Sequence, residues 1–225
     1  MKFAIQSGYW DRGVEALCRN FPYRIAKFPA IEPDEIPLGS VEWVEILLGR
    51  HVKPDYHPTF LSHLLLRKTR MQDEWPLGHP CFIKPAYRHK EWKAKIYSGR
   101  GYKGKKKGPY LISEIVRFRN EYRYYVANGK ILSGWWYWGD SQDDQQRHEG
   151  SEIPEAPILD TQFPETFCGA VDMGELWETG QLALIESNAP FSCGWYGEQD
   201  QSMDYCLFLQ AGWKWLKEGR DCLSD

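Results

Sequence analysis

The chain has 225 residues, of which 42% are hydrophobic and 15% aromatic, so it has enough apolar surface for a folded core and is not intrinsically disordered. Its 28 basic and 31 acidic side chains give a formal charge of −3, but these charges are segregated. Residues 84–107 contain ten basic side chains and one acid, a net charge of +9 that leaves −12 for the rest. Such segregation indicates either an anion site beside a cation site or a solvated lysine loop.

No stretch of the sequence approaches the ~20 apolar residues that a membrane helix needs. The N-terminus also turns polar too early for a secretory signal, so we expect a cytoplasmic protein with no membrane partner. The six cysteines form no C-x-x-C pair, which predicts reduced thiols and argues against a structural zinc site.

The first 65 residues are expected to form a small α/β unit. Three runs have the pattern of short strands, namely residues 2–6, 23–28 and 41–48. The Ser7-Gly8 turn after the first run leads into a predicted helix around residues 14–18. A further apolar run at residues 61–66 is predicted as helical.

The centre of the chain is predicted to be an antiparallel sheet. Its strand-like runs are residues 81–83, 110–116 and 121–127. Asn128-Gly129 follows the last of these and is typical of a tight hairpin turn, so residues 130–132 should return beside that strand. The glycine- and lysine-rich stretch 98–108 is too polar to pack.

A second strand pair is predicted at residues 168–173 and 181–186, after an acidic loop at 140–164, and residues 202–218 should form a closing helix. If the hairpin is centred on Thr179, Asp172 lies opposite Glu186, and Asn188 points to the same face. Carboxylate and amide oxygens are the ligands that Mg²⁺ prefers when it also keeps water and phosphate. A hydrogen-bonded acid and amide network without a metal is the alternative.

Lys84 is the corresponding residue on the basic side. It directly follows Phe82-Ile83, and a rigid strand places a phosphate ligand well. The alternative is a lysine at a strand end that extends its ammonium into solvent.

The order of these motifs resembles the ATP-grasp superfamily, particularly its compact clade of small phage and bacterial carboxylate-amine ligases. Each motif is weak alone, but seven in the right order are specific. The matching pieces are Phe82-Ile83-Lys84-Pro85, Lys95-Ile96-Tyr97-Ser98-Gly99, Ser113-Glu114-Ile115-Val116, Glu121-Tyr122-Arg123-Tyr124-Tyr125-Val126, Asn128-Gly129-Lys130-Ile131, Asp172-Met173-Gly174 and Leu184-Ile185-Glu186-Ser187-Asn188-Ala189-Pro190.

The resemblance implies an α+β ATP-grasp fold in which two subdomains with antiparallel sheets clasp a nucleotide. Residues 1–65 would form the α/β pre-ATP-grasp unit, and residues 66–118 the central subdomain with a lysine-rich lid at 99–108. Residues 119–225 would form the C-terminal subdomain, which carries the metal-binding strands.

The resemblance also implies a nucleotide site. Lys84 and Lys95 would contact the phosphates of ATP, and the backbone of the hinge Glu114, Ile115 and Val116 would read the adenine edge. Glu121 would bind the ribose hydroxyls, and Arg123 would hold the γ-phosphate as a donor fork.

Catalysis in this family needs no protein nucleophile, because positioning and charge neutralisation dominate phosphoryl transfer. The expected catalytic residues are Arg123 and Lys84. The expected ligands of one or two Mg²⁺ ions are Asp172, Glu186 and Asn188.

Enzymes of this type transfer the γ-phosphoryl group of ATP to a carboxylate, and an amine then attacks the acyl phosphate. The implied partners are therefore a small molecule or peptide with a carboxylate and an amine co-substrate. The candidate walls of the acceptor site are residues 7–10 and 188–197.

Two other functions stay open. A single-stranded nucleic-acid-binding protein would use the basic segment 84–107 on phosphates and aromatic side chains on bases. Three converging oxygen side chains have no use in such a protein. A non-catalytic ATP-grasp protein would bind nucleotide without ligating. The cluster at residues 135–138, Trp-Trp-Tyr-Trp, is either core or an aromatic platform for a ligand.

Overall fold

The computed structural model describes residues 1–76, 78–87, 91–100, 108–139 and 154–219. It begins with a three-stranded parallel sheet in the order β2-β1-β3, built from β1 (Lys2–Gln6), β2 (Tyr23–Ala26) and β3 (Glu35–Leu38). Helix α1 (Arg12–Asn20) follows β1, and α2 (Val41–Leu48) follows β3. The Asp11 side chain accepts a hydrogen bond of 2.8 Å from the Val14 amide and so begins α1.

The prediction of a strand at residues 41–48 is wrong, because these residues form α2. The Ser40 hydroxyl accepts a hydrogen bond from the Trp43 amide at the start of the helix, and Gly49 ends it with a φ of 67°. These two end signals decide between helix and strand where the apolar pattern is ambiguous. The third strand is instead residues 35–38, where Pro37 is tolerated because β3 lies at the sheet edge.

A second, antiparallel sheet has the order β4-β7-β5-β6. Its strands are β4 (Thr69–Gln72), β5 (Cys81–Pro85), β6 (Lys95–Tyr97) and β7 (Tyr110–Ser113), and a 3₁₀ turn at Thr59–Leu64 precedes them. One face of this sheet carries a small separate core formed by Cys81, Ile83, Tyr97, Tyr110 and Ile112.

A third sheet, also antiparallel, has the order β11-β10-β8-β9. Its strands are β8 (Phe118–Ala127), β9 (Lys130–Gly139), β10 (Gly169–Leu176) and β11 (Leu182–Asn188). The predicted hairpin at Asn128-Gly129 is confirmed, with φ angles of 50° and 73°. Two short 3₁₀ turns, Pro190–Ser192 and Gln199–Gln201, lead into helix α3 (Ser202–Lys217), which confirms the predicted closing helix.

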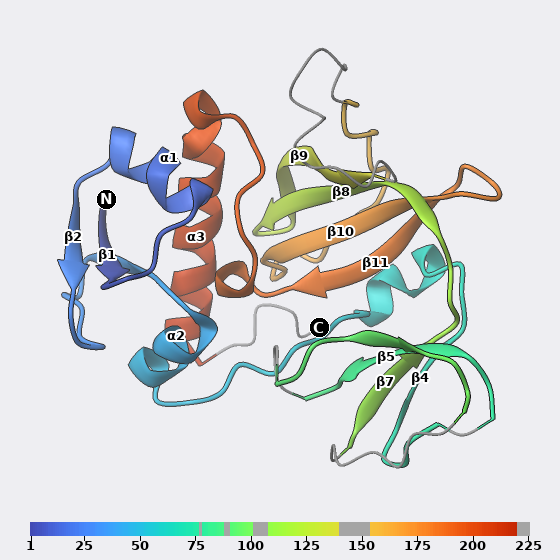
Figure 1. The fold of residues 1–225 in the computed structure, drawn as a ribbon. Coiled ribbons are helices and arrows are strands. Elements are labelled where there is room, and N and C mark those ends of the chain that lie inside the picture. The colour runs from blue at the N-terminus through green and yellow to red at the C-terminus, as the bar shows by residue number, and fades with distance from the viewer. Residues whose placement is uncertain (77, 88–90, 101–107, 140–153, 220–225) are drawn as a thin grey trace.

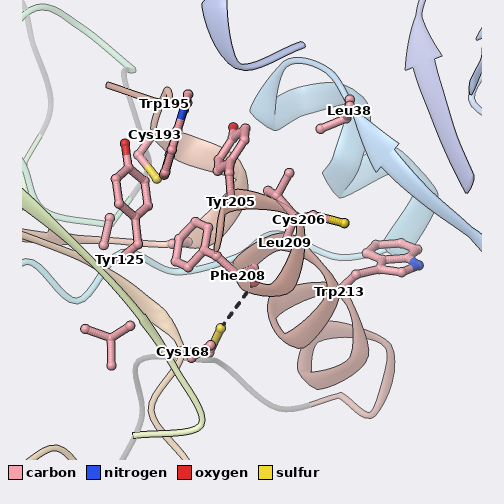
Figure 2. Close-up of a cluster of buried hydrophobic side chains, with 14 of the residues drawn as sticks. Leu38, Tyr125, Cys168, Cys193, Trp195, Tyr205, Cys206, Phe208, Leu209 and Trp213 are labelled. Carbon is pink, nitrogen blue, oxygen red and sulfur yellow. Dashed lines mark hydrogen bonds between the residues drawn. The ribbon is translucent and has the colours of Figure 1, made fainter. Parts of the chain in front are cut away.

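Helix α3 lies between the first and third sheets and joins them into one main core (Figure 1). Figure 2 shows Tyr205 and Phe208 of α3 facing Tyr125 of β8, and Cys168 donating to the Phe208 carbonyl. The N-terminal unit therefore packs against the C-terminal part, whereas the second sheet has its own core. The domain boundaries at 65 and 118 stay predictions.

Some expectations fall outside the described residues. Most of the lysine-rich lid (101–107) and much of the acidic loop (140–153) lie there, as does Cys222. The five described cysteines form no disulfide, as expected. In the described part of the chain no helix is long and apolar enough to cross a membrane.

Candidate functional site

A pocket of about 320 Å³ lies between the second and third sheets. Its apolar walls come from Phe82, Ile96 and Leu111 of the second sheet, and from Phe118 and Ile185 of the third. Apolar walls contributed by two sheets suit an aromatic ring.

The connection between β7 and β8 closes one end of this pocket. Glu114, Ile115 and Val116, the predicted hinge, all line it, and they lie between the two strands rather than in either. Phe82 pairs with Ser113, next to this connection, and Lys84 lies two residues farther along β5. Lys84 and Glu186 also line the pocket, so it combines apolar walls with the hinge segment and a charged pair.

A β-bulge places the acidic residues. Asp172 pairs with Glu186 as predicted, but Met173 pairs with Leu184, so Ile185 is an extra residue on β11. Asn188 lies two residues beyond Glu186 on the same face. Its Nδ2 lies 3.1 Å from Asp172 Oδ2 and 3.1 Å from Glu186 Oε1. The three side chains therefore converge.

Each of these carboxylates is paired with a cation that the sequence also singles out. The Lys84 ammonium, whose residue is 7% exposed, donates to Glu186 Oε2. Arg123, which is 8% exposed, donates through Nε and Nη2 to the two oxygens of Asp172, both at 2.7 Å. A two-point fork of this kind is the strongest geometry for an arginine and a carboxylate.

These pairs determine the protonation of the site. Burial alone would raise the pKa of Glu186, but Lys84 and the Asn188 amide outweigh burial and lower it. Burial lowers the pKa of Lys84, against the opposing effect of Glu186. Burial would also lower the pKa of Arg123, but Asp172 raises it well above its ordinary value. Glu186 is therefore ionised and Arg123 charged at neutral pH.

Glu121 lies beside the same acids. Its Oε2 accepts a hydrogen bond of 2.7 Å from the Tyr137 hydroxyl, and the residue lines the pocket. Burial raises the pKa of Glu121 in spite of that hydrogen bond, and the charges of Asp172 and Glu186 add to the effect. A carboxylate so placed can accept hydrogen bonds from a neutral ligand hydroxyl.

Arg67 is a member of the site that the sequence did not reveal. It lines the pocket and donates to Ser113 Oγ (2.9 Å), to Ile185 O (2.8 Å) and to the Leu184 carbonyl. β11 is an edge strand, and its bulge leaves these two carbonyls facing Arg67. Arg67 thus ties the second sheet to the metal-binding strand predicted in the third.

The segment before the 3₁₀ turn also reaches the site. The Tyr56 ring centroid lies 3.4 Å from Lys84 Nζ, a cation–π contact. His57 Nε2 lies 3.2 Å from the Ile185 carbonyl, which can only accept, so the ring proton is on Nε2. Burial and then the charges of Lys84 and Arg67 lower the pKa of His57 to about 4, so this ring is neutral at pH 7.

Two tyrosines flank Arg123. The Tyr137 and Tyr196 rings stack with centroids 5.0 Å apart, and the Arg123 guanidinium carbon lies 5.2 and 5.1 Å from them. Tyr196 comes from the loop that was expected to form an acceptor wall. Because Gly194 O accepts from Arg123 Nη1 at 3.4 Å, that loop does lie beside the site.

Lys95 lies elsewhere, and the cluster at residues 135–138 is divided. Lys95 pairs with Ile83 and so lies on the face opposite Lys84, with Nζ 5.0 Å from the Trp75 ring centroid. Trp135 and Trp136 pack against the main core, which favours the core interpretation for these two residues, whereas Tyr137 lies beside Arg123 in the site. The side chain of Trp138 is not among those that the structure describes.

The donor set fits a magnesium ion in its chemistry. Among the described residues no group of three or more His, Cys, Asp or Glu side chains forms a metal site. Here two carboxylates, Asp172 and Glu186, flank one amide, Asn188, so the third oxygen would come from that amide. Asn188 presents its Nδ2 to the carboxylates, so it must turn its amide over to offer Oδ1.

Comparisons with known proteins identify the family of the chain. A family model described as ATP-grasp domain, R2K clade family 2, matches residues 61–205, which is more than half of the chain. No curated protein matches the sequence.

Among solved structures, ATP-grasp ligase PsnB complexed with minimal precursor is 11% identical, with a TM-score of 0.50 over 93% of this chain and 98% of that one. The RimK domain ATP-grasp protein from Sphaerobacter thermophilus is 14% identical, with a TM-score of 0.48 over 93% and 98%. The D-alanine–D-alanine ligase from Bacillus anthracis complexed with ATP is 12% identical, with a TM-score of 0.43 over 97% and 99%. The likeness to PsnB shows the α+β ATP-grasp fold, and the family match shows that the chain belongs to R2K clade family 2 of the ATP-grasp domains.

Proposed function

We propose that the protein is an ATP-dependent ligase that joins a carboxylate to an amine through an acyl phosphate, with Mg²⁺ as its metal. One observation carries this proposal. A single pocket between two antiparallel sheets has apolar walls, is lined by the hinge residues and by the ion pair of Lys84 and Glu186, and has the ion pair of Arg123 and Asp172 next to it, joined to Glu186 through Asn188. These are the parts that a nucleoside triphosphate and its metal require.

The nucleotide would lie along this pocket. The adenine would stack between the apolar walls, with its edge against the hinge backbone of Glu114, Ile115 and Val116. Glu121 would accept hydrogen bonds from the ribose hydroxyls, and Lys84 would contact the phosphates. Lys95 faces Trp75 in this arrangement, so we do not include it in the site.

The metal would be held by Asp172, Glu186 and Asn188. When bound, Mg²⁺ neutralises phosphate charge and polarises the transferred group. Arg123, fixed by the Tyr137 and Tyr196 rings, lies beside these ligands and would face the γ-phosphate and the acceptor carboxylate. A positive fork at this point orients both anions and offsets their repulsion.

The reaction would proceed in two steps. A carboxylate oxygen of the acceptor attacks the γ-phosphorus, and the bond from that phosphorus to the bridging oxygen of ADP breaks. An amine then attacks the acyl carbon, inorganic phosphate leaves, and the amine proton passes to phosphate or water. No cysteine or serine is needed as a nucleophile. A cytoplasmic location suits these substrates and stays a prediction.

Oxygen labelling tests this chemistry. The protein would be incubated with Mg-ATP and a mixture of amino acids and small peptides labelled with ¹⁸O in their carboxylates. Release of ADP with one ¹⁸O atom per inorganic phosphate supports the proposal. Release of AMP and pyrophosphate contradicts it, and so does the absence of Mg-ATP binding by calorimetry. Binding of Mg-ATP without ADP from any mixture favours a non-catalytic protein.

Glu186→Ala is the matching variant. It should lose ADP release while keeping the circular dichroism spectrum of the wild type, because Glu186 lines the pocket and is not a member of the main core. Full activity in this variant would remove Glu186 from the metal site.

The nucleic-acid alternative has less support from the described residues. Its lysines would have to be exposed, but Lys84 is buried against Glu186. Its aromatic platform would have to face solvent, but Trp135 and Trp136 pack on the main core. We therefore do not propose it.

A further inference from the structure

The ion pair between Lys84 and Glu186 occupies groups that the proposed function needs for two different ligands. Lys84 should bind phosphate and Glu186 should bind the metal, yet in the structure each binds the other. Tyr56 covers the ammonium from another side, with its ring centroid 3.4 Å from Nζ. A phosphate that takes the donor now held by Glu186, or a metal ion that takes Glu186 Oε2, has to break this contact.

We propose that this ion pair makes the site accept a nucleotide only as its metal complex, with Glu186 holding Lys84 away from phosphate until a metal ion takes its place. The inference rests on the proposed function, because it assigns the two members of the pair to phosphate and metal. It adds a specificity determinant for the form of the nucleotide.

Either ligand on its own would leave one charge of the pair without a partner. Metal-free phosphate would draw Lys84 away and leave Glu186 as a carboxylate facing other acids. A metal ion alone would draw Glu186 away and leave the buried ammonium of Lys84 without a partner. Leaving one member of a buried pair uncompensated is strongly unfavourable. When metal and phosphate enter together, both groups find new partners at the same time.

The neighbouring pair between Arg123 and Asp172 is less suited to this role. Arg123 binds both oxygens of Asp172 and lies beside the Tyr137 and Tyr196 rings. Neither Arg123 nor Asp172 lines the pocket, whereas Lys84 and Glu186 both do. The Glu186 side chain is 28% exposed and the Asp172 side chain 2%. An incoming nucleotide therefore meets the pair of Lys84 and Glu186 first.

Binding without metal is the direct test. Calorimetry of ATP in the presence of EDTA should show wild-type affinity at least about tenfold below that for Mg-ATP. Glu186→Gln keeps the size of the side chain but frees Lys84, so it should bind metal-free ATP at least about tenfold more tightly than the wild type. A tenfold change corresponds to the loss of one charge-assisted hydrogen bond.

Glu175→Gln is the matched control. Glu175 lies on β10, carries the same charge, and pairs at the surface with Arg119 at 2.6 Å, away from the pocket. Its metal-free affinity should equal that of the wild type. If Glu186→Gln and Glu175→Gln give the same metal-free affinity, the inference is wrong. If no variant binds ATP with or without Mg²⁺, the proposed function itself fails.

A second measurement does not depend on the folding of Glu186→Gln. Lys84 and a metal ion compete for the same carboxylate, Glu186. Just as Glu186 should weaken the binding of metal-free nucleotide, Lys84 should therefore weaken metal binding in the absence of nucleotide. Lys84→Met should bind Mn²⁺, followed by electron paramagnetic resonance, at least about tenfold more tightly than Lys95→Met, which removes the same charge on the opposite face. Equal Mn²⁺ affinity in the two variants would overturn the inference.

Discussion

Arg67 is the residue whose loss tests the assembly of the site most directly. Its guanidinium donates to the Ser113 hydroxyl of β7 and to the carbonyls of Leu184 and Ile185 at the bulge of β11. It therefore joins the strand before the hinge to the strand that carries Glu186. Arg67→Met keeps the apolar stem and removes every one of these donors.

The expected loss of stability can be worked from these contacts. A hydrogen bond from a charged donor contributes about 1.5–3 kcal/mol, and a buried acceptor left without a donor costs about 1–3 kcal/mol. His57 still approaches the Ile185 carbonyl in the variant, and burial lowers the pKa of Arg67, which shows that desolvation offsets part of the gain. We therefore expect Arg67→Met to lower the free energy of unfolding by about 2–4 kcal/mol. That is a large part of the roughly 5–15 kcal/mol of a typical domain.

Urea denaturation followed by tryptophan fluorescence measures this difference. Arg70→Met is the control, because Arg70 lies three residues later, on β4, and its side chain is exposed. It should change stability by less than about 0.5 kcal/mol. Arg67→Lys should fall between the two, because one ammonium cannot reach all three acceptors. If Arg67→Met is as stable as Arg70→Met, the bulge carbonyls are satisfied without Arg67 and its assigned role is wrong.

Two further predictions concern the buried acid Glu35 and a close contact at the pocket. The Glu35 pKa is lowered to about 2 from 4.5, first by the hydrogen bonds from Arg24 and also by Lys2, so its contribution to stability is complete above pH 4.5 and is lost as the pH falls toward 2. The stability difference between wild type and Glu35→Gln, measured by urea titration, should therefore be constant from pH 7 to 5 and shrink below; a constant difference down to pH 2 would contradict this. A Cβ at Gly174 would lie 2.3 Å from the Phe118 ring, so Gly174→Ala should push that ring toward the pocket and weaken Mg-ATP binding in calorimetry. Unchanged affinity would show that Phe118 moves elsewhere.

Local sequence signals were sufficient for most strands. Asn128-Gly129 and the alternation around it predicted the β8 and β9 hairpin, because both signals lie within a few residues. Residues 41–48 show where such signals fail. Their apolar pattern suits either element, and only Ser40 and Gly49, just outside the run, distinguish a helix from a strand.

The pairing of Asp172 with Glu186 was predicted correctly for an incomplete reason. A hairpin without a bulge, paired as at Met173 and Leu184, would have moved Glu186 out of line with Asp172. The extra residue, Ile185, restores the pairing and turns carbonyls toward Arg67 and His57. Ile185 ends the apolar run 182–185 and carries no sign of a bulge, so neither the bulge nor its two partners was visible in the sequence.

The basic segment of the chain does not act as one unit in the fold, because its lysines lie on different faces of the second sheet. The basic segment begins with Lys84, which lies in an ion pair with an acid 102 residues away. Lys95, eleven residues later, lies on the opposite face of the same sheet and contacts an aromatic ring instead. Lys95 of β6 pairs with Ile83 of β5, and Ile83 and Lys84 point to opposite faces because neighbouring residues of a strand alternate, so these two lysines cannot serve one anion. The proposed site therefore depends on the local charges at the pocket rather than on the total charge of the segment. In the proposed mechanism Glu186 neutralises Lys84 until phosphate becomes the partner of Lys84 and the metal ion becomes the partner of Glu186.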